Sequence, residues 1–193
     1  MTDEELIEGL KAGDDQAAET AVRTHMPRML AVARRLLGDS ALAEDCVQEA
    51  FANMFRKIGA FEGRSSLGTW LYGIVANQAL MKLRQQTRRR EDPIDDLMPE
   101  FDTSACRIEA PWQHLSTPEE ILDREKRKDL VIDMINKLPA DYRVVLQLRD
   151  IEEMSTAEVA DALNLTDGNV KVRLHRARSA LRSLLEPVLR GEL

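Results

Sequence analysis

The sequence is poor in cysteine, aromatic residues and glycine, and each shortage narrows the classes of protein that remain. Only two cysteines are present, with no Cys-x-x-Cys pair or regular histidine spacing, which argues against a disulfide framework and a zinc site. Aromatic side chains make up 4% of the 193 residues, and the few glycines stand mostly near expected helix boundaries. Because strands are hard to place, the composition predicts an all-α protein.

No metal ligand, cofactor site or catalytic residue is predicted, and Cys46 is expected to be a small buried apolar side chain. Cys106 and His114 lie in one expected loop, but two candidate ligands are weak evidence for a metal site or for oxidant sensing. Clustered carboxylates and a phosphate-binding glycine loop are also lacking. We therefore expect no small-molecule substrate, and an enzyme acting on nucleic acid is the least favoured interpretation.

Long apolar runs are missing as well, since none approaches the 18 residues typical of a membrane-spanning helix. The acidic N-terminus has no apolar segment of signal-peptide length, so we expect a cytoplasmic protein without membrane insertion. A formal net charge of -7 argues against a general polycation such as a histone-like protein. Any contact with nucleic acid is therefore expected to come from local patches.

Apolar periodicity and boundary signals predict two small helical domains joined by a flexible acidic linker. The expected helices span about residues 4–11, 15–37, 41–58, 66–86, 118–138 and 140–149, followed by a helix-turn-helix. A kink or boundary is expected at Met26, because Pro27 follows it. The first domain is residues 1–90 and the second is residues 118–193. The linker is residues 91–117, where the chain becomes rich in proline and acids.

Residues 155–178 are typical of a DNA-binding helix-turn-helix. Ser155 followed by Glu158 forms a capping box, residues 164–166 supply the turn, and Thr166 can cap the second helix. The inward stripe of that helix is Val170, Leu174, Ala177 and Leu181. No acid occurs from Gly168 to Leu185, which favours phosphate contact. The alternative is an ordinary solvated helix of a bundle.

A second acid-free segment runs from Gly63 to Arg90 and mixes cations with aromatic side chains. Arg64, Lys82 and Arg84 are its isolated cations. A basic track beside aromatic rings suits unpaired bases of single-stranded DNA. Trp70 also fits the core stripe of the expected helix, so a purely structural role for its ring is the alternative. The acidic face in residues 43–51 precedes this segment and is suited to a basic helical partner, the alternative being a solvated surface.

Three motifs in this order resemble the extracytoplasmic-function sigma factors of the bacterial primary-sigma superfamily. The core-polymerase-binding segment of region 2 resembles AEDCVQEAF at residues 43–51. The promoter-melting and -10 recognition segment resembles FEGRSSLGTWLYGIVANQAL at residues 61–80. The region 4 pattern, usually ending GTVKSRLHRAR, resembles GNVKVRLHRAR at residues 168–178. The order and separation of the motifs are more specific than any one of them.

The resemblance implies a stress-responsive transcription initiation factor that binds core RNA polymerase at the β′ clamp and the β flap. The residues implied in core binding are Asp45, Val47, Gln48, Glu49 and Phe51. Those implied at the -10 element are Phe61, Gly63, Arg64, Ser65, Trp70, Asn77, Lys82 and Arg84. Among them, the Phe61 to Ser65 loop and Asn77 are expected to capture flipped bases. Control by an anti-sigma factor is also implied, because no further domain that could sense a signal follows Leu193.

The residues implied at the -35 element are Asn169, Lys171, Val172, Arg173, His175, Arg176 and Arg178. Of these, Arg173 and Arg178 are expected to meet phosphates or hold the fold. Val172 stands where the family commonly has serine, and Asn169 where it usually has threonine. An apolar side chain can contact a thymine methyl group, so promoter preference is expected to differ.

The linker corresponds to the family's short substitute for region 3, and its acidity is hypothesised to mimic nucleic acid near the RNA exit path. The acids concerned are Asp92, Asp95, Asp96 and Glu100. The alternative function is a conventional repressor or activator with the same helix-turn-helix. Such a protein would bind duplex promoter DNA alone, whereas a sigma factor requires the polymerase.

Overall fold

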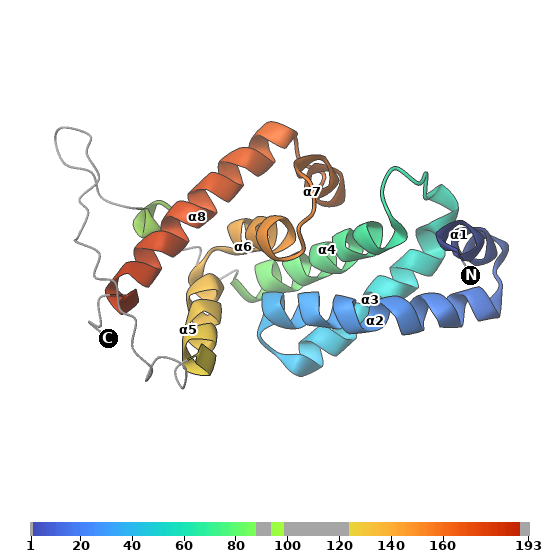
Figure 1. Cartoon of the computed structure of the whole chain (residues 1–193), viewed down its shortest axis with the longest axis horizontal. Helices are drawn as coiled ribbons and strands as arrows, with labels where there is room; N and C mark the ends of the chain where they lie inside the picture. The colour runs from blue at the N-terminus through green and yellow to red at the C-terminus, as the bar shows by residue number, and fades with distance from the viewer. Residues whose placement is uncertain (1, 88–93, 99–123, 190–193) are drawn as a thin grey trace.

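The computed structural model describes residues 2–87, 94–98 and 124–189, and Figure 1 shows their arrangement. These residues form helices and contain no strand, which confirms the predicted all-α fold class. The expected helix start at Thr117-Pro118 and most of the acidic linker lie outside the described residues, as do Cys106 and His114.

The helices of the N-terminal half are α1 (Asp3–Ala12), α2 (Asp15–Leu37), α3 (Ser40–Lys57) and α4 (Leu67–Thr87). The first three begin after Thr2, Asp14 and Asp39, whose side chains accept backbone N–H groups of the first helical turn. Gly13 and Gly38 end α1 and α2 with left-handed φ angles of 76° and 69°. These signals are local, which is why the predicted helix bounds lie close to the observed ones.

Helices α2, α3 and α4 pack around an apolar core. Cys46 is fully buried in this core, as predicted, and its thiol donates to the carbonyl of Val75 at 3.6 Å. Burial raises the pKa of the thiol to about 11, so Cys46 stays protonated at neutral pH.

Of the kink or boundary expected at Met26, the boundary is not present, because α2 continues through Pro27. Proline removes one intrahelical hydrogen bond and crowds the preceding turn. However, the buried side chains Ala17, Ala21, Met29 and Val32 lie on both sides of it and pack into the same core. Burial along the whole helix therefore outweighs the local cost of the proline.

The helices of the C-terminal half are α5 (Arg124–Lys137), α6 (Ala140–Leu146), the π-helical segment η4 (Gln147–Ile151), α7 (Thr156–Leu163) and α8 (Asp167–Leu189). The capping box between Ser155 and Glu158 is present, and Asn164 ends α7 in the left-handed conformation with φ 53°. Val170, Leu174 and Ala177 are buried and Leu181 is partly buried, as the stripe predicted. The helix-turn-helix is confirmed.

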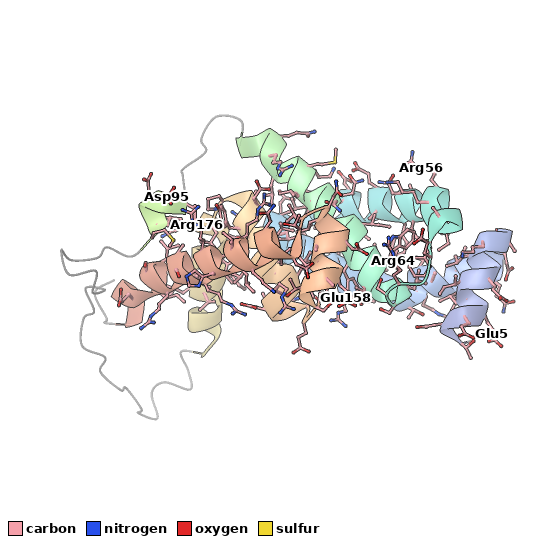
Figure 2. All side chains as sticks on the ribbon, turned by 90° about the horizontal axis from the view of Figure 1, so that it is seen from above. Glu5, Arg56, Arg64, Asp95, Glu158 and Arg176 are labelled. Atoms are coloured by element: carbon pink, nitrogen blue, oxygen red, sulfur yellow. The ribbon has the colours of Figure 1, made fainter. Side chains whose placement is uncertain are left out.

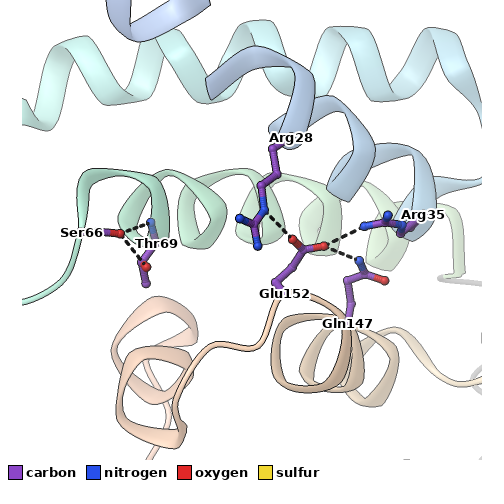
Figure 3. Close-up of polar contacts among 6 residues, drawn as sticks. All are labelled: Arg28, Arg35, Ser66, Thr69, Gln147 and Glu152. Atoms are coloured by element: carbon purple, nitrogen blue, oxygen red, sulfur yellow. Dashed lines mark hydrogen bonds and ion pairs between the residues drawn. The ribbon is translucent and has the colours of Figure 1, made fainter. Parts of the chain in front are cut away.

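The two halves pack against each other along α4, which contacts both α6 and α7 (Figure 1). Gly73 of α4 permits this approach, since a Cβ there would lie 2.7 Å from the Cβ of Ala162 in α7. The buried carboxylate of Glu152 accepts from Arg28 Nε at 3.1 Å and from Arg35 Nη1 at 2.9 Å (Figure 3). Gln147 Nε2 also donates to Glu152 at 2.9 Å. The buried apolar side chains of the two halves also form one continuous core.

Candidate polymerase-binding and DNA-binding surfaces

The polar residues predicted to bind core polymerase lie on the solvent side of α3. Asp45, Gln48 and Glu49 are exposed, whereas Val47 and Phe51 are buried at 3% and 6% exposure. The structure therefore brings the three polar side chains to one surface. Val47 and Phe51 lie beneath that surface and hold α3 against the core.

An apolar side chain on the same helix was missed in the sequence. Phe55 is 43% exposed and follows Gln48 by two helical turns, which places it on the same face of α3. The seven-residue spacing between Gln48 and Phe55 was the sequence signal that could have placed Phe55 on this face. Phe55 therefore adds an exposed apolar side chain to the face that carries the three polar residues.

The loop predicted to capture bases connects the 3-10 turn η1 (Ile58–Ala60) to α4. Phe61 is 6% exposed, and Lys11 Nζ donates to its carbonyl at 2.9 Å, which ties the loop to α1. Gly63 has a left-handed φ of 72°, and both Gly63 and Arg64 are exposed, while Ser65 is half-buried. The loop is therefore anchored at its start and projects its tip into solvent.

Trp70 lies between the loop and the core. Its ring centroid is 4.9 Å from that of Phe61, and the half-buried side chain packs against the core. Ser66 caps α4 by accepting from the Thr69 backbone N–H at 3.1 Å, and the two hydroxyl oxygens lie 2.9 Å apart (Figure 3). The cap fixes the start of α4 and hence the position of Trp70.

A cavity lies between this loop, α4 and α7. The predicted -10 residues that line it are Phe61, Arg64, Ser65, Trp70 and Asn77. The Asn77 amide donates to the Gly73 carbonyl at 3.0 Å and also to the carbonyl of Ala162 in α7. Arg64 Nη2 is 3.8 Å from Asp161 Oδ2. The first helix of the helix-turn-helix thus forms the opposite wall of the cavity.

Lys82 and Arg84 are not brought to this cavity. Lys82 Nζ lies 3.1 Å from Glu49 Oε1 on α3, and Arg84 Nη2 lies 2.5 Å from Asp141 Oδ1 on α6. Both cations are further along α4, and each is paired with a carboxylate of another helix. The predicted -10 set therefore divides into five residues that line the cavity, Gly63 in the exposed part of the loop, and two cations further along α4.

The exposed face of α8 carries most of the residues predicted at the -35 element. Thr166 Oγ1 accepts from the Asn169 N–H at 3.2 Å, which confirms Thr166 as the cap. Asn169, Lys171, Val172 and His175 are exposed, with Val172 at 58%. These side chains lie opposite the buried stripe and form one continuous polar and apolar surface.

Arg173 and Arg178 are held by carboxylates of the same half. Arg173 Nη1 is 3.8 Å from Asp141 Oδ1, while Arg178 donates to both oxygens of Asp150 at 2.9 and 2.6 Å. The hydrogen bonds to Asp150 raise the pKa of the Arg178 guanidinium. Of the two roles expected for Arg173 and Arg178, phosphate contact or holding the fold, these contacts support the second.

Arg176 is paired with a carboxylate from outside the helix-turn-helix. Its guanidinium binds Asp95 of η2 (Ile94–Leu97), a 3-10 turn in the segment assigned to the linker, and Figure 2 labels both side chains. Arg176 Nη1 also lies 3.4 Å from the hydroxyl of Tyr142. Asp95 and Arg176 are 81 residues apart, so no local sequence pattern pairs Asp95 with α8.

Within the described ranges, no group of three or more His, Cys, Asp or Glu side chains is placed to hold a metal ion. The same ranges contain no helix long and apolar enough to cross a membrane.

Comparison with known protein families gives two matches along the chain. Residues 21–89 match sigma-70 region 2, and residues 128–181 match sigma-70 region 4. The RNA polymerase sigma-H factor of Pseudomonas aeruginosa is 32% identical over 188 residues, covering 97% of this chain and 96% of that protein. The ECF RNA polymerase sigma-E factor of Escherichia coli K12 is 30% identical over 195 residues, covering 98% and 97%.

Two solved structures are similar over most of the chain. CnrH in complex with the cytosolic domain of CnrY has a TM-score of 0.62 at 23% identity, covering 95% of this chain and 96% of that one. This likeness shows the fold. The sigma factor RpoE of Bartonella quintana, in complex with the anti-sigma factor NepR, has a TM-score of 0.57 at 25% identity, covering 86% and 95%.

Proposed function

The chain belongs to the extracytoplasmic-function sigma factors of the sigma-70 superfamily, and we propose which of its surfaces serve each step of promoter-specific initiation. It is an RNA polymerase sigma factor, so the conventional repressor or activator is not favoured. Sigma factors of this superfamily are non-catalytic initiation factors. Since its partner polymerase works there, we place the protein in the cytoplasm.

The exposed face of α3 is the proposed docking site for the β′ clamp of core polymerase. Asp45, Gln48 and Glu49 supply charge and hydrogen-bond acceptors for a basic partner helix, and Phe55 supplies an apolar anchor two turns from Gln48. Val47 and Phe51 support this face from the core. The C-terminal half is proposed to sit on the β flap.

The loop at residues 61–65 and the start of α4 are proposed to hold the -10 strand. Arg64 at the loop tip suits phosphate, and the cavity beneath offers the Trp70 ring and the Asn77 amide to an unpaired base. In this structure the Asn77 amide donates a hydrogen bond to the Ala162 carbonyl of α7. The two halves are therefore proposed to separate when the factor binds polymerase and promoter.

The exposed face of α8 is proposed to recognise the -35 element in the major groove. Lys171, His175 and Arg176 offer donors to base edges, and Val172 offers an apolar contact to a thymine methyl. Arg173 and Arg178 are proposed to hold the fold, because Asp141 and Asp150 already bind them.

An anti-sigma factor is the proposed regulator. The solved complex of RpoE with NepR supports this, because a similar chain is there bound to an anti-sigma factor.

The convergence of five predicted -10 residues on one cavity, beside an intact helix-turn-helix, is the observation that carries the proposal. The test is a footprint on the DNA upstream of the gene that encodes this chain, with and without purified core polymerase. Protection of both -35 and -10 regions only when polymerase is present is expected. Protection of the same duplex by the chain alone would support the repressor or activator instead.

A further inference from the structure

The segment Ile94–Met98 lies on α8, the helix proposed to recognise the -35 element, and its contacts are both apolar and ionic. Ile94 is 5% exposed and belongs to the core, while Leu97 and Met98 are partly buried against it. Asp95 binds the guanidinium of Arg176, and Figure 2 shows the two labelled side chains together.

The geometry of this segment places one charge against α8. The backbone N–H of Met98 donates to the Asp95 carbonyl at 3.1 Å, which closes the turn between Ile94 and Met98. Asp95 and Asp96 are both exposed, but an ion pair in the described part of the chain is formed only by Asp95. The turn therefore presents a carboxylate to the same guanidinium that DNA would contact.

Arg176 Nη2 binds Asp95 and Nη1 lies 3.4 Å from the Tyr142 hydroxyl, so both terminal nitrogens are occupied in this arrangement. A bidentate contact with the paired acceptors of guanine needs two N–H groups of the guanidinium, and Asp95 competes for one of them. The ion pair is partly exposed, so by itself it is weak. Burial of Ile94 keeps the segment close, and this raises the effective concentration of Asp95 beside Arg176.

We propose that Ile94–Met98 is an intramolecular competitor of the -35 element, which occupies Arg176 until promoter DNA displaces it. This inference rests on the proposed role of α8 in -35 recognition. In this proposal Asp95, an acid of the linker, acts on α8. The sequence-based hypothesis instead placed the acids of the linker near the RNA exit path. Displacement of the segment leaves Arg176 free for DNA without any change in the rest of the helix-turn-helix.

The test compares three full-length variants with the wild type. Asp95→Asn removes the competing charge, and Ile94→Ser removes the apolar anchor. Asp96→Asn is the matched control, because it removes the same charge from the next residue of the turn. The probe is a duplex carrying the -35 sequence that this chain with core polymerase selects from a random pool. Binding is measured with each protein bound to core polymerase, at one fixed salt concentration.

Asp95→Asn is expected to tighten duplex binding about two- to five-fold relative to Asp96→Asn. Ile94→Ser is expected to tighten duplex binding at least as much as Asp95→Asn. It is also expected to speed hydrogen exchange at the Met98 amide in the absence of DNA. Equal binding by all four holoenzymes would overturn the inference while leaving the proposed function intact. Failure of the holoenzyme to select any -35 sequence would instead remove the proposed function, and the inference with it.

Discussion

At the scale of single residues, Arg176 contacts Asp95 in this structure and is proposed to contact a base edge on the promoter. Arg176→Ala is expected to reduce the preference of the holoenzyme for the cognate over a scrambled -35 element by about 1–3 kcal/mol, the size of a bidentate guanine contact. Transcription from the two templates measures this preference. Arg178→Ala is the matched control, since its guanidinium is bound by Asp150. An unchanged preference in Arg176→Ala would remove Arg176 from -35 recognition.

Glu152 carries two ion pairs that join the C-terminal half to α2. Its side chain is 2% exposed and binds Arg28 and Arg35 of α2. Glu152→Gln keeps the shape but removes the charge, so we expect the free energy of unfolding to fall by about 1–3 kcal/mol. Urea unfolding measures the loss, with the exposed neighbour Glu153→Gln as control. Equal stability of the two variants would show that the buried ion pairs contribute nothing.

At the scale of elements, the exposed face of α3 is proposed to dock on the polymerase. The opposite face of α3 packs into the core. Asp45→Arg reverses one charge of the exposed face and is expected to weaken binding to core polymerase before any DNA is added. Glu8→Arg makes the same charge change on the exposed surface of α1. A fluorescence binding assay with purified core measures both variants. Unchanged affinity for Asp45→Arg would exclude Asp45 from the interface.

Helix α7 depends on its capping box. The Ser155 backbone N–H donates to Glu158 Oε2 at 2.7 Å, and this bond is the main cause that lowers the pKa of Glu158. The stabilisation is therefore fully present above the ordinary carboxyl pKa of about 4.3 and is lost as pH falls through the lower folded pKa. The stability difference between wild type and Glu158→Gln is expected to shrink in acid. A difference of the same size at pH 7 and pH 3 would contradict this account.

Helix bounds were predictable because their causes are local. Ser155, Asp39 and Gly38 act within one turn of the helices that they start or end. Pro27 shows the limit of local reasoning, since burial over the whole length of α2 decided against a boundary there. The exposed position of Phe55 followed from helical spacing and was available in the sequence.

At the scale of the whole molecule, the sequence could not show which surfaces the two halves turn toward each other. The bond from Asn77 to Ala162 joins residues 85 positions apart, and the bond from Arg28 to Glu152 joins residues 124 apart. No local pattern encodes such pairs, because they depend on the packing of α4 against α7. The family motifs predicted the candidate site residues, but not that α7 and η2 contact some of them in the free chain.

The two halves are proposed to recognise one promoter together on core polymerase. The test is transcription by purified core polymerase and this chain from the DNA upstream of its own gene. We expect one polymerase-dependent start site whose use falls when either the -35 or the -10 element is scrambled. Initiation that is independent of this chain, or equal on intact and scrambled templates, would contradict the account.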